Sequence, residues 1–103
     1  MTSRRSVQWV SLALFDLNAI YDFHRRRNAV AARRLMHRIG EGAEMLVAHP
    51  EAGPVAPDLE PEGRYRHVLV GPYRIIYRLD EERVFVLRIW DSRRNPDDLV
   101  VHD

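Results

Sequence analysis

Two neighbouring segments near the C-terminus, YRIIYRL at residues 73–79 and RVFVLRIW at residues 83–90, decide the fold of this chain. Both are rich in β-branched and aromatic residues, and a three-residue turn joins them, so they predict an antiparallel hairpin. A further strand is predicted at residues 64–70, because a Gly-Pro turn separates it from residue 73. The C-terminal half therefore predicts three antiparallel strands.

The N-terminal half predicts one more strand and two helices. The strand is expected at residues 6–10, and apolar spacings of three and four predict helices at residues 12–27 and 29–49. Ser11 and Asn28 are the candidate N-caps. The second helix should bury the stripe Ala32, Leu35, Ile39, Ala43 and Leu46. The order β-α-α-β-β-β predicts an α+β domain in which a helical hairpin packs on one face of a small antiparallel sheet.

Length and composition limit the classes of protein to consider. A chain of 103 residues with 46% apolar side chains suits one domain spanning residues 1–103. Residues 50–63 hold four prolines and two glycines and are expected to form a loop, and the tail from residue 91 is polar. No apolar run approaches the roughly 18 residues that span a bilayer, so we expect no membrane association. The absence of cysteine favours a reducing cytoplasm.

All 16 basic residues are arginine, although the formal net charge is only +1. Arginine suits two-bonded contacts with phosphate or carboxylate groups. A genome whose base composition favours arginine codons would give the same bias, so only the placement of individual arginines is informative.

Strand alternation gathers arginines on one side of the predicted sheet. If the more apolar sides meet the helices, the exposed face carries Arg64, Arg66, Arg74, Arg78 and Arg88. Such a face can be simply solvated, but a solvated face normally mixes both signs of charge, and no acid lies here. We therefore expect the face to meet an anionic or acidic partner. Trp90 ends the last strand beside it, either stacking on a base or partner side chain or packing at the sheet edge.

Other functional motifs are missing from the sequence. The five histidines show no H-E-x-x-H or H-x-H spacing, so we expect no metal site, and no glycine-rich phosphate loop or other cofactor motif is present. His24 and His37 are expected on helix surfaces. Six arginines lie near the turn between the two predicted helices, at positions Arg25, Arg26, Arg27, Arg33, Arg34 and Arg38. They form either a second basic patch or only a solvated helix end.

The stretch RHVLVGPYRIIYRLDEERVFVLRIWDSRR at residues 66–94 resembles the C-terminal half of the RelE/ParE toxin superfamily. The segments LFDLNAIYDF, NAVAARRLMHRI and LVAHPEAG are similar to the family's helical hairpin and its L-x-x-x-P-x-x-G exit. The resemblance covers residues 7–94 and is closer to the ParE, or plasmid stabilisation, branch. It implies a toxin of a bacterial type II toxin–antitoxin module, forming a hetero-oligomer with its antitoxin. RelE-like members cleave ribosome-bound mRNA, and ParE-like members poison DNA gyrase.

The resemblance also assigns residues. Arg66 matches the basic residue of the strand before the Y-R-I-I-Y motif, Arg74 matches the arginine inside it, and Arg93 and Arg94 match the basic pair after the last strand. Asp91 stands where many members have histidine, and no tyrosine follows residue 77. We therefore expect a gyrase inhibitor that acts by binding. The alternatives are a RelE-like endoribonuclease, in which Asp91 is catalytic, and an inactive relative retained only as an antitoxin-binding or DNA-binding corepressor module.

Overall fold

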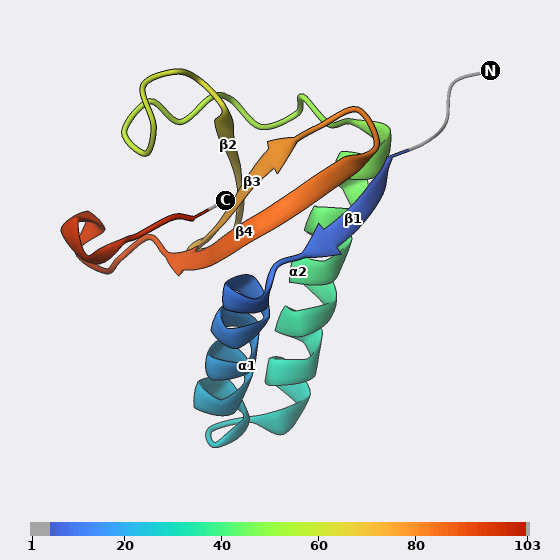
Figure 1. Cartoon of the computed structure of the whole chain (residues 1–103). Coiled ribbons are helices and arrows are strands. Elements are labelled where there is room, and N and C mark those ends of the chain that lie inside the picture. The colour runs from blue at the N-terminus through green and yellow to red at the C-terminus, as the bar shows by residue number, and fades with distance from the viewer. Residues whose placement is uncertain (1–4, 103) are drawn as a thin grey trace.

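Residues 5–102 are described by a computed structural model, shown in Figure 1. The elements are β1 (Ser6–Trp9), α1 (Ser11–Arg25), α2 (Ala29–Ala48), β2 (Tyr65–Val70), β3 (Tyr73–Leu79), β4 (Arg83–Asp91) and a 3₁₀ turn, η1 (Pro96–Asp98). This order confirms the predicted β-α-α-β-β-β arrangement. Within the described residues, neither helix combines the length and apolar character needed to cross a bilayer.

The four strands form one sheet in the order β1-β4-β3-β2. The pairs β2–β3 and β3–β4 are antiparallel, as their short connections require. β1 instead pairs with β4 in parallel, so the sheet is mixed rather than wholly antiparallel. The short-connection argument does not constrain this pair, because the helical hairpin and the two other strands separate β1 from β4 along the chain.

The two helices follow the predicted pattern with two exceptions. All five residues of the predicted α2 stripe are buried, and the Asn28 side chain caps α2 by accepting a bond from the Ala31 N–H at 3.0 Å. The prediction that Ser11 caps α1 is wrong, because Val10 occupies the N-cap position and no side chain caps it. Leu14, one of the apolar residues whose spacing predicted this helix, is 45% exposed, while Asp16 is buried. Asp16 is tolerated inside because Arg88 pairs with it.

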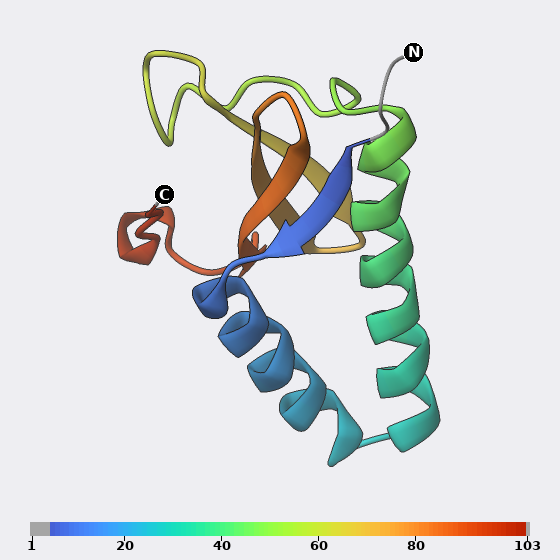
Figure 2. The same cartoon turned by 45° about the vertical axis from the view of Figure 1, so that its right-hand side comes forward.

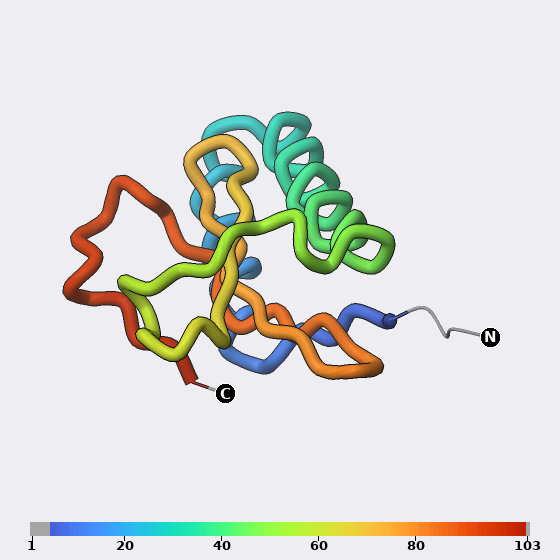
Figure 3. The backbone as a smooth tube through the Cα atoms, turned by 90° about the horizontal axis from the view of Figure 1, so that it is seen from above, coloured from blue at the N-terminus to red at the C-terminus, as the bar shows by residue number. Residues whose placement is uncertain are grey.

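Both faces of the sheet are covered. The helices pack on one face, where Leu35 and Ile39 of α2 meet Ile75 and Ile89. On the other face, a second cluster of Tyr65, Ile76, Leu87 and Trp90 lies under Leu59 of the loop and under Leu99 and Val101 of the tail. Figure 2 shows the hairpin on one side of the sheet with the loop and tail toward the other, and Figure 3 shows the tail away from α2. The polar tail therefore packs on the sheet, and it contains the 3₁₀ turn η1.

A bulge in β4 changes which side chains face the helices. Ile76 pairs with Arg88 and Tyr77 pairs with Val86, so Leu87 is an extra residue without a partner in β3. Val86 consequently packs with the helices, whereas Leu87 belongs to the cluster on the opposite face. Strict alternation from Arg88 on the exposed face would instead place Val86 on that face and Leu87 toward the helices.

Candidate functional site

The predicted single arginine face does not form. Arg66 pairs across the sheet with Tyr77 and shares the helix-facing side of β2 with Val68 and Val70, which pack on the helical core. Its Nη1 donates to the Gly53 carbonyl oxygen at 2.8 Å. The assignment of Arg66 to the opposite face is therefore wrong, because the two valines turn this side of the strand toward α2.

Arg64, Arg66 and Arg78 do meet at the start of β2, around a hollow of about 290 Å³. Arg64 Nε lies 3.3 Å from the Glu60 carboxylate, which is mostly buried. Burial alone would raise the pKa of Glu60, but backbone hydrogen bonds from Arg64 and Glu62, together with the Arg64 guanidinium, outweigh it and lower that pKa. Two acids thus reach a face that strand alternation had left purely basic.

Arg74 fastens the 50–63 loop to the sheet. Its two terminal nitrogens each donate to one carboxylate oxygen of Asp58 at 3.0 Å, and its Nε donates to His67 Nδ1 at 2.7 Å. Because the guanidinium keeps all its protons, Nδ1 is the acceptor and His67 is neutral. Burial and the Arg74 charge lower the pKa of His67, and the bonds from Arg74 lower the pKa of Asp58. Only 12% of the Arg74 side chain is exposed, so it is not the free cation that the alternation predicted.

Arg88 also forms an ion pair and is not a free cation. Its Nε lies 2.7 Å from Asp16 of α1, and its Nη1 donates to the carbonyl oxygen of Val100 in the tail. Trp90 beside it is 3% exposed and carries the Arg94 guanidinium 4.3 Å above its ring. Trp90 therefore packs within the sheet edge and is not available to stack on a base.

A groove of about 500 Å³ lies between α1 and the end of β4. Phe15 and Phe23 of α1 line one wall, and Tyr73 and Ile89 of the sheet line the other. The two phenylalanines are unusually open, at 70% and 52% exposed. Arg93 and Arg94, both exposed, also line it. The groove thus combines an apolar wall with cations, a combination suited to an apolar and acidic partner.

Asp91, which also lines this groove, forms an ion pair with Arg93. Arg93 donates to both oxygens of the Asp91 carboxylate at 2.9 Å, and these bonds hold the pKa of Asp91 below its usual value. The opposite charge raises the pKa of Arg93 in turn. Both groups therefore stay ionised at neutral pH.

Tyr73 connects the groove to the end of α1. Its hydroxyl lies 2.7 Å from His24 Nε2, so His24 is half-buried rather than a free surface residue. Burial raises the pKa of Tyr73, the Asp91 charge raises it further, and the Arg93 charge opposes them. An imidazole, a phenol and a carboxylate thus lie near one another, which are groups able to exchange protons. No cluster suited to a metal ion occurs among residues 5–102.

Sequence reasoning missed the groove. Phe15 and Phe23 are eight residues apart on α1, and neither belongs to the set whose spacing predicted this helix, which is Leu14, Leu17, Ile20 and Tyr21. Large aromatic side chains away from the buried stripe were the available signal. The pairing of Tyr73 with His24, 49 residues earlier, has no signal in a single sequence.

A family model described as "ParE toxin of type II toxin-antitoxin system, parDE" matches residues 7–96. The chain belongs to this family. This ParE-family protein is also 34% identical over 88 residues to toxin RelE2 of Caulobacter vibrioides, across 85% of this chain and 96% of that protein. The predicted membership of the RelE/ParE superfamily is confirmed, and the protein is a toxin of a type II toxin–antitoxin system.

Two solved structures share the fold of the ParE-family toxin. A chain of the chromosomal ParDE system of P. aeruginosa is 25% identical, with a TM-score of 0.71 over 84% of this chain and 94% of that one. A chain of the RelBE2 toxin–antitoxin complex of Mycobacterium tuberculosis is 22% identical, with a TM-score of 0.62 over 84% of this chain and 96% of that one. The second likeness concerns the fold alone.

Proposed function

We propose that this toxin acts on DNA gyrase by binding, without chemistry of its own, and that an antitoxin neutralises it. The observation that carries the proposal is the groove between α1 and β4, where exposed Phe15 and Phe23 stand beside Arg93 and Arg94. Open aromatic side chains next to arginines are typical of protein interfaces.

The lowered pKa of Asp91 and the ion pairs of Arg74 and Arg88 argue against RNA cleavage. Attack by a 2′-hydroxyl needs a base, an acid and cations that meet the developing phosphorane charge. Asp91 is a poor base, because its pKa is lowered by Arg93. Arg74 has its charge balanced by Asp58, and Arg88 by Asp16. These pairs would have to break before either arginine met a phosphate.

A RelE-like nuclease is the second candidate. The likeness to toxin RelE2 favours it, as does the Tyr73–His24 hydrogen bond beside Asp91. In this case Asp91 and the tyrosine–histidine pair would handle the protons, and Arg93 and Arg94 would meet the phosphate. An inactive relative that only binds an antitoxin is the third candidate, and it predicts no growth defect when the chain is expressed.

The antitoxin proposed here presents a partly disordered segment that folds on the toxin. Apolar side chains of that segment would cover Phe15 and Phe23, and its acidic side chains would meet Arg93 and Arg94. The similarity to a chain of the P. aeruginosa ParDE system supports a hetero-oligomer of this kind.

Regulated expression tests the proposal. Expression alone should arrest growth, and co-expression of the small protein encoded in the adjacent reading frame should relieve the arrest. Phe15→Ala should weaken binding of that protein about tenfold or more, since an interface aromatic often contributes 1–2 kcal/mol or more. Leu69→Ala is the matched control, because Leu69 is 64% exposed but lies on β2, outside the groove. Equal effects of the two variants would remove the groove as the antitoxin site.

A further inference from the structure

The charge of the chain is strongly segregated. Residues 22–38, at the tip of the helical hairpin, hold six arginines and one aspartate, a formal charge of +5. The remaining ten arginines and fourteen acids give −4, so the near-neutral total hides a basic end. In Figure 1 this tip lies at the bottom of the molecule, far from the turn between β3 and β4.

Helix stability does not explain the placement of these arginines. Arg33, Arg34 and Arg38 lie in the first half of α2, whose first turn has no acid, while Glu41 and Glu44 follow them. Cations are unfavourable near a helix N-terminus and acids near a C-terminus, because of the helix dipole. The charges on α2 are therefore arranged against its own dipole.

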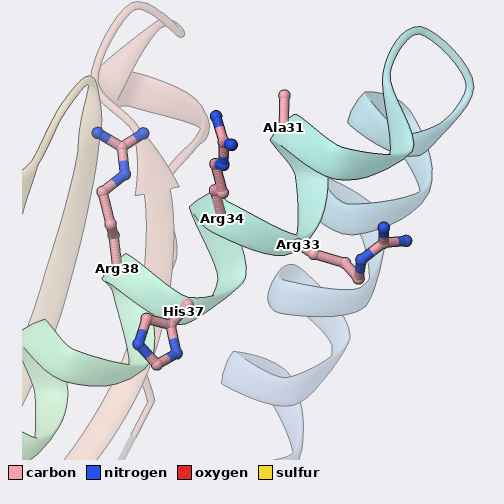
Figure 4. Close-up of a pocket in the computed structure, with 5 residues that line it drawn as sticks. All are labelled: Ala31, Arg33, Arg34, His37 and Arg38. Carbon is pink, nitrogen blue, oxygen red and sulfur yellow. The ribbon is translucent and has the colours of Figure 1, made fainter.

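No carboxylate in the described part of the chain neutralises these three arginines. Within residues 5–102 no acid lies at ion-pair distance from Arg33, Arg34 or Arg38, in contrast to the paired Arg74 and Arg88. They line a shallow surface with Ala31 and His37, and Figure 4 shows Arg34 and Arg38 projecting to the same side, one helical turn apart. His37 is paired with Glu41. We call Arg33, Arg34 and Arg38 the hairpin basic surface.

We propose that the hairpin basic surface binds the phosphate backbone of duplex DNA. Guanidinium groups form bidentate hydrogen bonds with phosphate oxygens, and contacts to the DNA backbone dominate nonspecific DNA binding. The residues lining this surface include no phenylalanine, tyrosine or tryptophan, so it lacks the large aromatic anchors of a protein interface and of a site for single-stranded bases. Arg26 and Arg27 lie in the adjoining turn and add two positive charges to this end of the molecule. This inference does not depend on gyrase being the target.

Fluorescence anisotropy with a labelled 20-base-pair duplex tests the proposal on the full chain, free of antitoxin. The apparent Kd should lie at about 10⁻⁶–10⁻⁴ M near physiological salt and rise steeply with salt. Arg34→Gln with Arg38→Gln should lower the slope of log affinity against log salt by about 2. Raising the salt concentration from 50 to 200 mM should therefore weaken DNA binding by this variant roughly tenfold less than binding by the wild type.

The control variant combines Arg5→Gln with Arg83→Gln, which removes the same charge beside the turn between β3 and β4. There Arg5 donates to the Asp80 carbonyl oxygen. This variant should keep the wild-type slope, and circular dichroism should show all three proteins folded. Equal slopes for the two variants would overturn the proposal, as would tighter binding of polyglutamate than of DNA. Preference for duplex RNA over duplex DNA would also overturn it, assigning the surface to RNA.

Discussion

Arg88 of β4 and Asp16 of α1 form a bidentate ion pair, although they are 72 residues apart in sequence, with N–O distances of 2.7 and 3.0 Å. Asp16 also accepts the Ile89 backbone N–H at 3.0 Å. β1 pairs with β4 only as far as Val86. Asp16 therefore supplies a hydrogen-bond acceptor for the β4 backbone just beyond the end of β1. The pair thereby sets α1 against β4 and forms the base of the groove.

Breaking this pair should destabilise the fold. Asp16→Ala leaves Arg88 largely buried without its partner, because the two side chains are 10% and 12% exposed. We expect a loss of about 3–5 kcal/mol in the free energy of unfolding, measured by urea denaturation. Asp22→Ala, which breaks an exposed pair with Arg25, should cost about 0.5 kcal/mol or less. Similar losses for the two variants would mean that burial of the Arg88–Asp16 pair contributes nothing.

His67 should make stability depend on pH. Its folded pKa lies below the unfolded value of 6.5, so the unfolded chain binds more protons in the window below 6.5. Stability should therefore fall as the pH drops from 7.5 to 5.5. His67→Asn keeps an acceptor for Arg74 but cannot titrate, so its melting temperature should fall less over this range. The other histidines are common to both proteins, and parallel melting curves would contradict the assignment.

Two glycines of α2 offer a matched test of helix packing. A Cβ at Gly40 meets no atom within 4 Å, whereas a Cβ at Gly42 lies 2.8 Å from Val70 Cγ2. Gly40→Ala should raise the free energy of unfolding by about 0.5–1 kcal/mol through helix propensity. Gly42→Ala should give no such gain, because crowding in a packed core typically costs about 1–3 kcal/mol. Equal gains in urea denaturation would show that α2 does not pack closely on the sheet at Gly42.

Asp91 separates the two candidate mechanisms. Asp91→Asn removes the charge while nearly keeping the shape. A toxin that acts by binding should keep at least half of its potency in the growth assay, whereas a nuclease that relies on this carboxylate should lose mRNA cleavage. Abolished toxicity in a folded variant would favour the nuclease.

Much of the fold could be predicted from the sequence, because periodicity determines which side of an element is apolar. The α2 stripe and the three C-terminal strands are where the spacing indicated. Periodicity failed where a local irregularity or a distant partner decided the outcome. The bulge at Leu87 moved Val86 to the helical face, and acids from α1 and the loop, Asp16 and Asp58, neutralised arginines that strand alternation left exposed.

The groove was beyond the same reasoning. It depends on how α1 lies beside β4, which Asp16 and Arg88 determine through a contact that sequence spacing does not encode. Arg93 and Arg94 were identified through the family resemblance, and the structure brings them beside Phe15 and Phe23.

Inhibition of gyrase supercoiling by the purified chain is the most direct test that this toxin acts on gyrase by binding. We expect the wild type and Asp91→Asn to inhibit supercoiling to a similar extent. Arg93→Ala with Arg94→Ala should inhibit much less while remaining folded, since both side chains are exposed. Unaffected supercoiling by a folded wild-type chain that cleaves ribosome-bound mRNA would contradict the account.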